Sequence, residues 1–276
     1  MGICEEITSE LPTTLLYHYT SQRGILGIVK NKSIWATDIH YLNDAAEVQN
    51  AIEIVHEEFR KRRELESQES AIIDEFSNHF ESGLNNFLIY CVFSLSEEGD
   101  LLSQWRSYCP QSGGYSIGFD PSLLIEVVKK PGFSLVKCIY DRTKQENIIR
   151  QLIDESVNAY KNTPNGIANM AVEDFFIKFC RICPMFKHPS FWEEREWRLV
   201  SNFPNLQSKF REGESLITPY VEIKLTEEEE YIPIKQVFIG PTPHKELSRQ
   251  SVLFMLNSHN IRGCTVVCSE IPYRTW

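Results

Sequence analysis

The sequence predicts an α+β fold, in which a split, mixed or antiparallel sheet is flanked by helices. Short apolar and aromatic runs alternate along the chain with longer segments of helical spacing. Residues 87–94 are almost continuously apolar, which is typical of a central strand covered on both faces. No repeat, low-complexity linker or Pro/Gly/Ser-rich seam divides the chain, so a single domain over residues 1–276 is expected, with helical excursions at about 44–84 and 142–183.

The first third of the chain predicts two strands, each followed by a helix. The run 15–20 is apolar and aromatic, and the N-cap residue Ser21 follows it before a helical pattern over 23–30. A second short strand is expected at 33–37. Asp44 and Glu47 then have the spacing of a capping box, which predicts the start of a long helix.

The rest of the chain continues this mixed pattern after the central strand. Helices are expected at 101–108, 142–162, 167–183 and 245–257, and strands at 115–119, 134–140, 194–200, 219–224, 236–240 and 264–268. Residues 227–230 predict an acidic turn. Such an order of elements favours one sheet with a helical insertion.

Composition argues against several classes of protein. The chain has 28 Lys and Arg against 38 Asp and Glu, a net charge of −10, which disfavours nonspecific nucleic-acid binding. The first residues lack a basic signal-peptide region and no stretch reaches the ~20 apolar residues of a membrane span, so a cytoplasmic protein is expected. Its 8 cysteines are expected to be reduced, and the spacings 180/183 and 264/268 are too weak to predict zinc, so no metal is expected.

The segment 192–200 is the strongest candidate for chemistry. Read as a strand, it places Glu194, Glu196 and Arg198 on one face, and Trp197 and Leu199 on the other. An apolar face that anchors the strand would hold the carboxylates of Glu194 and Glu196 in a cleft, as a catalytic site requires. The alternative is a solvated edge strand whose charges keep it soluble.

No strong catalytic motif is present: the chain has no phosphate-binding glycine loop, HExxH or GxSxG. The remaining candidates are dispersed polar and aromatic residues, which would bind a substrate if the fold gathers them. They are His18, Tyr19, Thr20, Trp105, Arg106, Tyr108, Tyr115 and Arg198, with Asn43, Asp44 and Glu47 as further possibilities. Each also has a structural interpretation, as a core residue, a helix cap or an ion-pair partner.

Several blocks together resemble the bacterial domain of unknown function 2971. They are Tyr-His-Tyr-Thr (17–20), Tyr-Leu-Asn-Asp-x-x-Glu (41–47), Phe-Ser-x-Ser (93–96), Leu-Ser-Gln-Trp-Arg-Ser-Tyr (102–108), Gly-Gly-Tyr-Ser-Ile-Gly-Phe-Asp (113–120), Glu-x-Glu-Trp-Arg-Leu (194–199) and Ile-Pro-Tyr-Arg (271–274). This resemblance covers nearly the whole chain. It implies a family without a settled activity.

A second resemblance is to the His-Tyr-Glu type of the ADP-ribosyltransferase superfamily. It implies that His18 and Thr20 hold the ribose and amide of NAD, that Tyr108 or Tyr115 stacks on nicotinamide, and that Glu196 or Glu194 binds the ribose 2′-hydroxyl. Arg106 or Arg198 would pair with the pyrophosphate. The implied activity is cleavage of NAD and transfer of ADP-ribose to a macromolecule or to water, in a role that would suit a toxin or phage-defence effector.

Two other functions remain open. One is a Mg²⁺-dependent phosphodiesterase or nuclease with Asp44, Glu47, Glu194 and Glu196 as oxygen ligands. The other is a non-catalytic module whose aromatic cleft binds a nucleotide or a partner protein. The NAD hypothesis predicts that His18, one Tyr and Glu196 converge on a single cleft.

Overall fold

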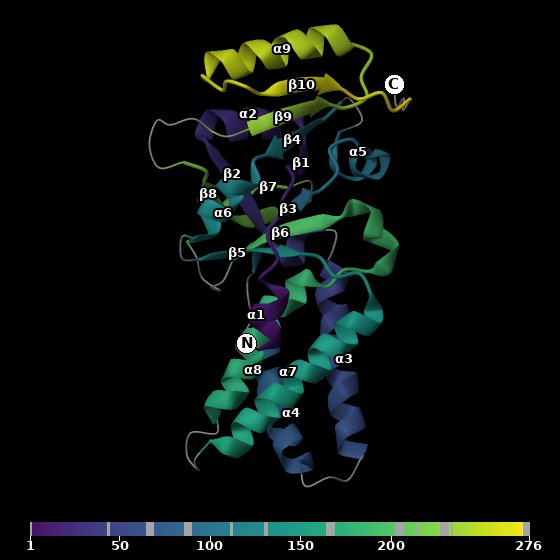
Figure 1. The fold of residues 1–276 in the computed structure, drawn as a ribbon, viewed down its shortest axis with the longest axis vertical. Coiled ribbons are helices and arrows are strands. Elements are labelled where there is room, and N and C mark those ends of the chain that lie inside the picture. Colours follow the sequence, from purple (N-terminus) through teal and green to yellow (C-terminus); the bar gives the residue numbers. More distant parts are fainter. Residues whose placement is uncertain are drawn as a thin grey trace.

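The computed structural model describes residues 2–42, 45–64, 69–85, 90–110, 113–129, 132–163, 169–201, 207–213, 215–226, 232 and 234–272. These ranges form a 10-stranded sheet with helices packed on it and a group of helices extending from one end (Figure 1). The α+β class predicted from the sequence is therefore confirmed.

The first half of the chain supplies the middle of the sheet. Its elements are α1 (Ile3–Ile7), β1 (Leu16–Thr20), α2 (Gln22–Asn31), β2 (Ser33–Asp38), the 3-10 helix η1 (Ile39–Tyr41), α3 (Ala45–Glu64), α4 (Ser70–Asn85), β3 (Cys91–Ser96), α5 (Leu102–Tyr108), β4 (Tyr115–Phe119) and α6 (Pro121–Lys129). The Ser21 side chain accepts a hydrogen bond from Gly24 N, so the predicted N-cap of α2 is confirmed.

The second half adds two long helices and the outer strands. Its elements are β5 (Phe133–Lys137), α7 (Arg142–Asn162), α8 (Asn169–Ile182), the 3-10 helices η2 (Cys183–Met185) and η3 (Pro189–Glu194), β6 (Glu196–Ser201), β7 (Lys209–Glu212), β8 (Ile217–Lys224), β9 (Ile234–Ile239), α9 (Lys245–Ser258) and β10 (Thr265–Cys268). The sequence pattern did not predict α1, α6 or β7, which are short. The predicted acidic turn at 227–230 lies outside the described residues.

The sheet branches at β3. The main strand order is β10-β9-β4-β1-β3-β2-β8-β7, and β6 also pairs with β3 and carries β5 on its other side. Strand β1 shares only the pair Tyr17–Ser96 with β3, whereas five residue pairs join β3 to β6. Among the described strand pairs, only β9 and β10 run parallel, so the sheet is mixed.

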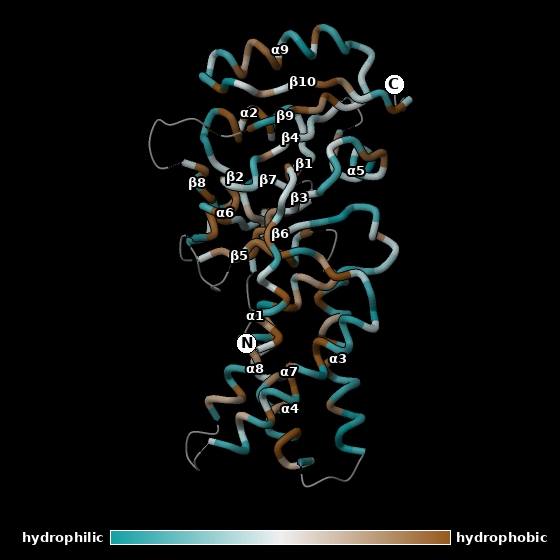
Figure 2. Tube along the Cα trace, in the orientation of Figure 1, coloured by the Kyte–Doolittle hydropathy of each residue, from teal (hydrophilic) through white to brown (hydrophobic). Residues whose placement is uncertain are grey.

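Two hydrophobic cores lie on opposite faces of this sheet. One is the interior of the bundle α3, α4, α7 and α8, which reaches the sheet through Val92, Val136 and Val200. The other lies under α2, α6 and α9 and contains Trp197 and Leu199. Neighbouring residues of β6 thus belong to different cores, as side-chain alternation requires. Hydrophobic segments accordingly appear both within the bundle and along the sheet (Figure 2).

None of the helices in the described ranges is both long enough and apolar enough to cross a membrane.

Two glycines of α2 give a matched test of how β1 packs against this helix. A Cβ on Gly24 would lie 1.8 Å from Thr20 Oγ1, whereas a Cβ on Gly27 would meet nothing within 4 Å. We expect Gly27→Ala to increase the free energy of unfolding by about 0.5–1 kcal/mol, because alanine restricts the unfolded chain and favours helix. Gly24→Ala should lower it, because Thr20 must move. Urea denaturation measures both, and equal effects would contradict this packing.

Candidate functional site

The predicted catalytic segment is mounted differently from the expected strand. Strand β6 begins at Glu196, while Glu194 ends the 3-10 helix η3, and Arg195 between them has a φ of 43°. This left-handed residue turns the chain sharply. Glu194, Glu196 and Arg198 nevertheless come together, on the sheet face that meets the helical bundle.

These residues join Lys187 and Glu47 in a buried ion network. Lys187 Nζ lies 2.6 Å from Glu196 Oε2 and 2.8 Å from Glu194 Oε2. Arg198 donates from Nε to Glu196 Oε1 at 2.8 Å and from Nη2 to Glu47 Oε2 at 2.9 Å. Its Nη1 donates to the carbonyl oxygen of Pro184 at 2.8 Å. One network therefore ties α3, η2 and η3 to the sheet.

Burial and pairing fix the ionisation of this network. Arg198 is 0% exposed and Glu196 is 4% exposed. Burial alone would raise the pKa of Glu196, but the positive charges of Arg198 and Lys187 outweigh it and lower that pKa to about 2. The predicted cleft in front of Glu196 is wrong for the described residues, because the bundle covers this face. A solvated edge strand is equally wrong.

His18, Thr20 and Tyr115 lie on the other face of the sheet. The His18 ring is 4.2 Å from the ring of Phe93, which shares its core with Leu199, and Tyr115 is the direct cross-strand partner of Thr20. Burial lowers the pKa of His18 to about 4, and its Nδ1 lies 3.0 Å from the carbonyl oxygen of Ser94. His18 and Tyr115 therefore do not converge with Glu196, contrary to expectation, because the sheet separates them.

Tyr19 and Trp105 form a packed pair where α5 meets β1. Their rings are 4.7 Å apart, and the Tyr19 hydroxyl donates to Glu98 O and accepts from Leu101 N. Trp105 Nε1 donates to Asp100 Oδ1 at 2.7 Å. Both side chains are buried in this arrangement. Arg106 and Tyr108, on the same helix, are exposed.

Three of the carboxylates that were expected to bind Mg²⁺ belong to the buried ion network. Glu47, Glu194 and Glu196 do meet, but Lys187 and Arg198 lie among their oxygens. Asn43 and Asp44 lie outside the described residues. Within those residues, no group of three or more His, Cys, Asp or Glu side chains is arranged to hold a metal ion.

Sequence reasoning missed a surface on the strands β2, β8 and β7, here called the aromatic platform. Cross-strand pairing places its side chains on one face: Trp35, Thr37, Lys209, Arg211, Tyr220 and Glu222. The Trp35 ring is stacked 4.4 Å from the Tyr220 ring and is 39% exposed. A rigid, partly exposed indole is thus held against a second ring.

Arg211 gives the platform an unusual charge. Its guanidinium donates to Thr37 Oγ1 at 3.1 Å, and burial lowers its pKa. It makes no ion pair with any carboxylate in the part of the chain that the structure describes. Nearby, Glu222 is paired with both Lys209 and Lys224. Two lysines thus share one carboxylate, and Arg211 adds a further positive charge on the same face of a chain whose net charge is −10.

The sequence contains a signal for the part of the aromatic platform that lies on β2. In β2, the apolar residues Ile34 and Ala36 alternate in the sequence with Ser33, Trp35 and Thr37. A tryptophan on the polar face of a strand indicates a possible binding residue. Arg211 had no such signal, because β7 is entirely exposed and lacks a pattern of alternation.

Glu196→Gln should cause a large loss of stability, because it removes a negative charge that balances the buried cations Lys187 and Arg198. We expect the free energy of unfolding at pH 7 to fall by about 3–5 kcal/mol. The stabilisation from the lowered pKa is complete above the reference value of 4.5 and is lost as pH falls from 4.5 towards 2. The mutant should therefore lose less stability than the wild type over that range. Denaturation curves at several pH values measure the stability of both proteins. Glu193→Gln, which changes an exposed carboxylate, is the control. An unchanged midpoint for Glu196→Gln would contradict a stabilising role of the network.

Part of the chain matches a known family model. Searches among curated proteins and among solved structures gave no match. Residues 104–199 match the family model described as "Protein of unknown function (DUF2971)". The match runs from α5 to β6 and includes Trp105, Tyr115, Glu196 and Arg198. Over these residues, the predicted similarity of this chain to the DUF2971 family is confirmed.

Proposed function

We propose that this chain binds a nucleotide on the aromatic platform. The observation that carries the proposal is the pairing of an exposed, ring-supported Trp35 with an arginine that no described carboxylate neutralises. The platform corresponds to the nucleotide-binding alternative that the sequence left open. It lies on different residues from those expected.

The base would stack on Trp35. Every nucleobase has a π face, and an indole held by a second ring loses little conformational freedom on stacking. The opposite face of Trp35 is already occupied by Tyr220, which fixes the ring. Stacking of this kind contributes about 1–3 kcal/mol per base.

The phosphate would pair with Arg211. A guanidinium presents paired N–H donors that match phosphate oxygens. Arg211 is anchored on Thr37, two residues along β2 from Trp35. Two residues span about 7 Å of a strand, so one nucleotide can reach both side chains.

The charge of the whole chain favours a free nucleotide over a nucleic acid. Nucleic-acid binding needs many phosphate contacts, and the net charge of −10 opposes them outside this local patch. NAD and simpler nucleotides both fit the proposal. All eight cysteines are free thiols, which supports the reducing cytoplasm as the place of action.

Trp35→Leu should weaken nucleotide binding by roughly 5- to 150-fold, the range that corresponds to a lost stacking interaction. Arg211→Gln should weaken it by about tenfold or more, and more for ATP than for adenosine. Calorimetric titration with adenosine, AMP, ATP and NAD measures these effects.

The matched controls are Trp192→Leu and Arg249→Gln. Both remove an exposed side chain of the same type from another element, η3 or α9. Neither should change affinity. The proposal fails if no nucleotide binds, or if these controls weaken binding as much as the platform variants.

A second candidate is NAD cleavage at Glu196 by an ADP-ribosyltransferase-like enzyme, including a toxin or phage-defence role. Two observations favour it: the Glu196 carboxylate stays ionised, as stabilisation of an oxocarbenium-like centre requires, and β1 and β6 both border β3. Catalysis would require η3 to move, because Phe191 covers Lys187 at 5.4 Å. Glu196 would otherwise stay sealed from substrate.

If this candidate holds, purified protein should release nicotinamide from NAD without added metal, with or without cell lysate as a source of acceptors. Chromatography detects the product. Glu196→Gln should abolish release at a temperature where circular dichroism shows that it is folded, and Glu193→Gln should retain it. Absence of release from the wild type would exclude the candidate and leave the nucleotide-binding proposal intact.

A further inference from the structure

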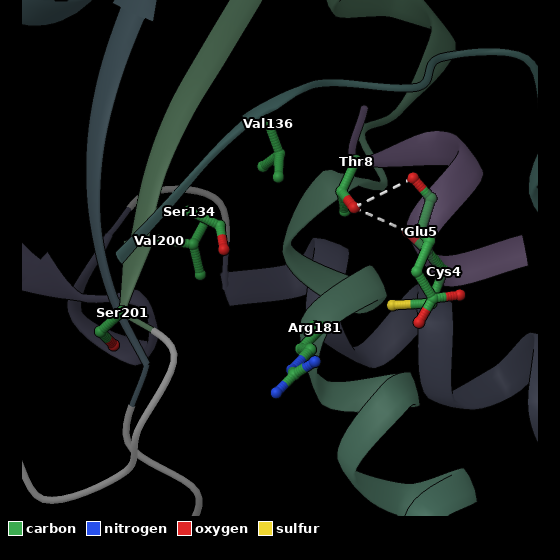
Figure 3. A pocket seen from close by; sticks show the side chains of 8 residues that line it. All are labelled: Cys4, Glu5, Thr8, Ser134, Val136, Arg181, Val200 and Ser201. Carbon is green, nitrogen blue, oxygen red and sulfur yellow. Dashed lines mark hydrogen bonds between the residues drawn. The ribbon is translucent and has the colours of Figure 1, made fainter. Parts of the chain in front are cut away.

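The hollow shown in Figure 3 is too small for a protein partner. It lies where α1 and α8 meet β5 and β6, and it encloses about 80 Å³, room for a few water molecules. Its apolar walls, Val136 and Val200, are already buried, so they offer little area to a partner. A segment of another protein needs an open surface, and β7 provides one.

Strand β7 has a free edge. It ends the strand order, and all four of its residues are exposed. At the hairpin turn, Gly213 N donates to the carbonyl oxygen of Leu216. Hydrogen-bonded and non-bonded pairs alternate along an antiparallel ladder. The backbone groups of Arg211 therefore also face β8, whereas those of Phe210 and Glu212 point to the free edge, where no described strand pairs with them.

One face of the hairpin formed by β7 and β8 is apolar and open. Phe210 is 68% exposed and Ile217 is 70% exposed. The register places both on the same face, because Phe210 lies opposite Pro219 and Ile217 lies opposite Glu212 on the neighbouring strand. Burial of apolar area is the main favourable contribution to protein association. An added strand would cover Phe210 with its own apolar side chains.

The charges of β7 argue against a second copy of this chain at the same edge. Two identical strands pair at an edge about a two-fold axis. Centred on Phe210, this pairing places Lys209 of one copy opposite Arg211 of the other, and centred on any other residue of β7 it places Lys209, Arg211 or Glu212 opposite itself. Like charges directly opposite each other are destabilising. The partner therefore needs a different sequence.

We propose that the free edge of β7 binds an extended segment of another protein in which acidic and apolar residues alternate. Successive side chains of a strand point to opposite faces. The acidic side chains would lie beside Lys209 and Arg211 on the platform face, and the apolar ones beside Phe210 on the other face. The backbone of the segment would pair with the outward groups of Phe210 and Glu212, as in other cases of strand addition.

The test is fluorescence anisotropy of a labelled, end-blocked peptide of alternating Glu and Val, titrated with the full chain in the absence of nucleotide. We expect saturable binding. The same peptide with Lys in place of Glu should bind weaker by about tenfold or more, because its charges then match those of Lys209 and Arg211. Since no nucleotide is present, the result does not depend on the function proposed above.

Three variants and a control locate the binding. Phe210→Ser should weaken it by about tenfold, because the exposed ring is lost. Phe254→Ser is the control, since it removes a Phe that is 74% exposed on α9, and it should bind like the wild type. Glu212→Pro should also weaken binding about tenfold or more, because it removes an outward N–H but no bond to β8. Glu212→Gln keeps that N–H and should bind at least as tightly as the wild type.

The thermal unfolding midpoint of each variant reports whether it folds, and Phe210→Ser with its control decides the matter if Glu212→Pro does not. The proposal is overturned if the Glu peptide does not bind the wild type, if the Lys peptide binds equally well, or if Phe254→Ser weakens binding as much as Phe210→Ser. A wild-type dimer in sedimentation velocity that Phe210→Ser dissolves would also overturn it, because the edge would then bind a second copy.

Discussion

Arg198 is completely buried where β6 meets the helical bundle, and the joint between these two parts depends on its neutralisation there. Burying an unpaired guanidinium would cost much free energy, so the surrounding structure must supply negative charges and hydrogen-bond acceptors. Glu196 comes from the same strand and Glu47 from the start of α3, while η2 supplies a carbonyl oxygen. The position of α3 over the sheet is thus coupled to the charge on one strand.

The packing of the bundle around this ion network also determines which part of the sheet surface a ligand can reach. The bundle covers the middle of one face through the ion network, and α2, α6 and α9 cover the apolar core on the other. Open sheet surface therefore remains towards its end, on β2, β8 and β7, where Trp35 is exposed. Charged residues that look catalytic in the sequence lie in the joint, whereas the accessible aromatic residue lies outside it.

The arginines of this acidic chain differ in the compensation they receive. Arg198 meets two carboxylates within hydrogen-bonding distance, and its pKa rises because those charges outweigh its burial. Arg211 meets none among the described residues. Since a cation without a local partner attracts anions from solution, the proposed nucleotide site includes this arginine rather than Arg198.

The sequence by itself determined the elements with a clear period or cap. It located the Ser21 cap of α2, the long helices from the spacing of apolar residues, and the two faces of 196–200, because local geometry fixes these features. It could not show which face of the sheet each candidate would occupy. Only the tertiary structure decided that His18 and Glu196 are separated by the sheet, that Lys187 enters the carboxylate group from nine residues upstream of Glu196, and that Arg211 reaches Thr37 across 174 residues of sequence. These contacts depend on strand order and layer packing, which act between segments distant in the chain and leave no period in the sequence.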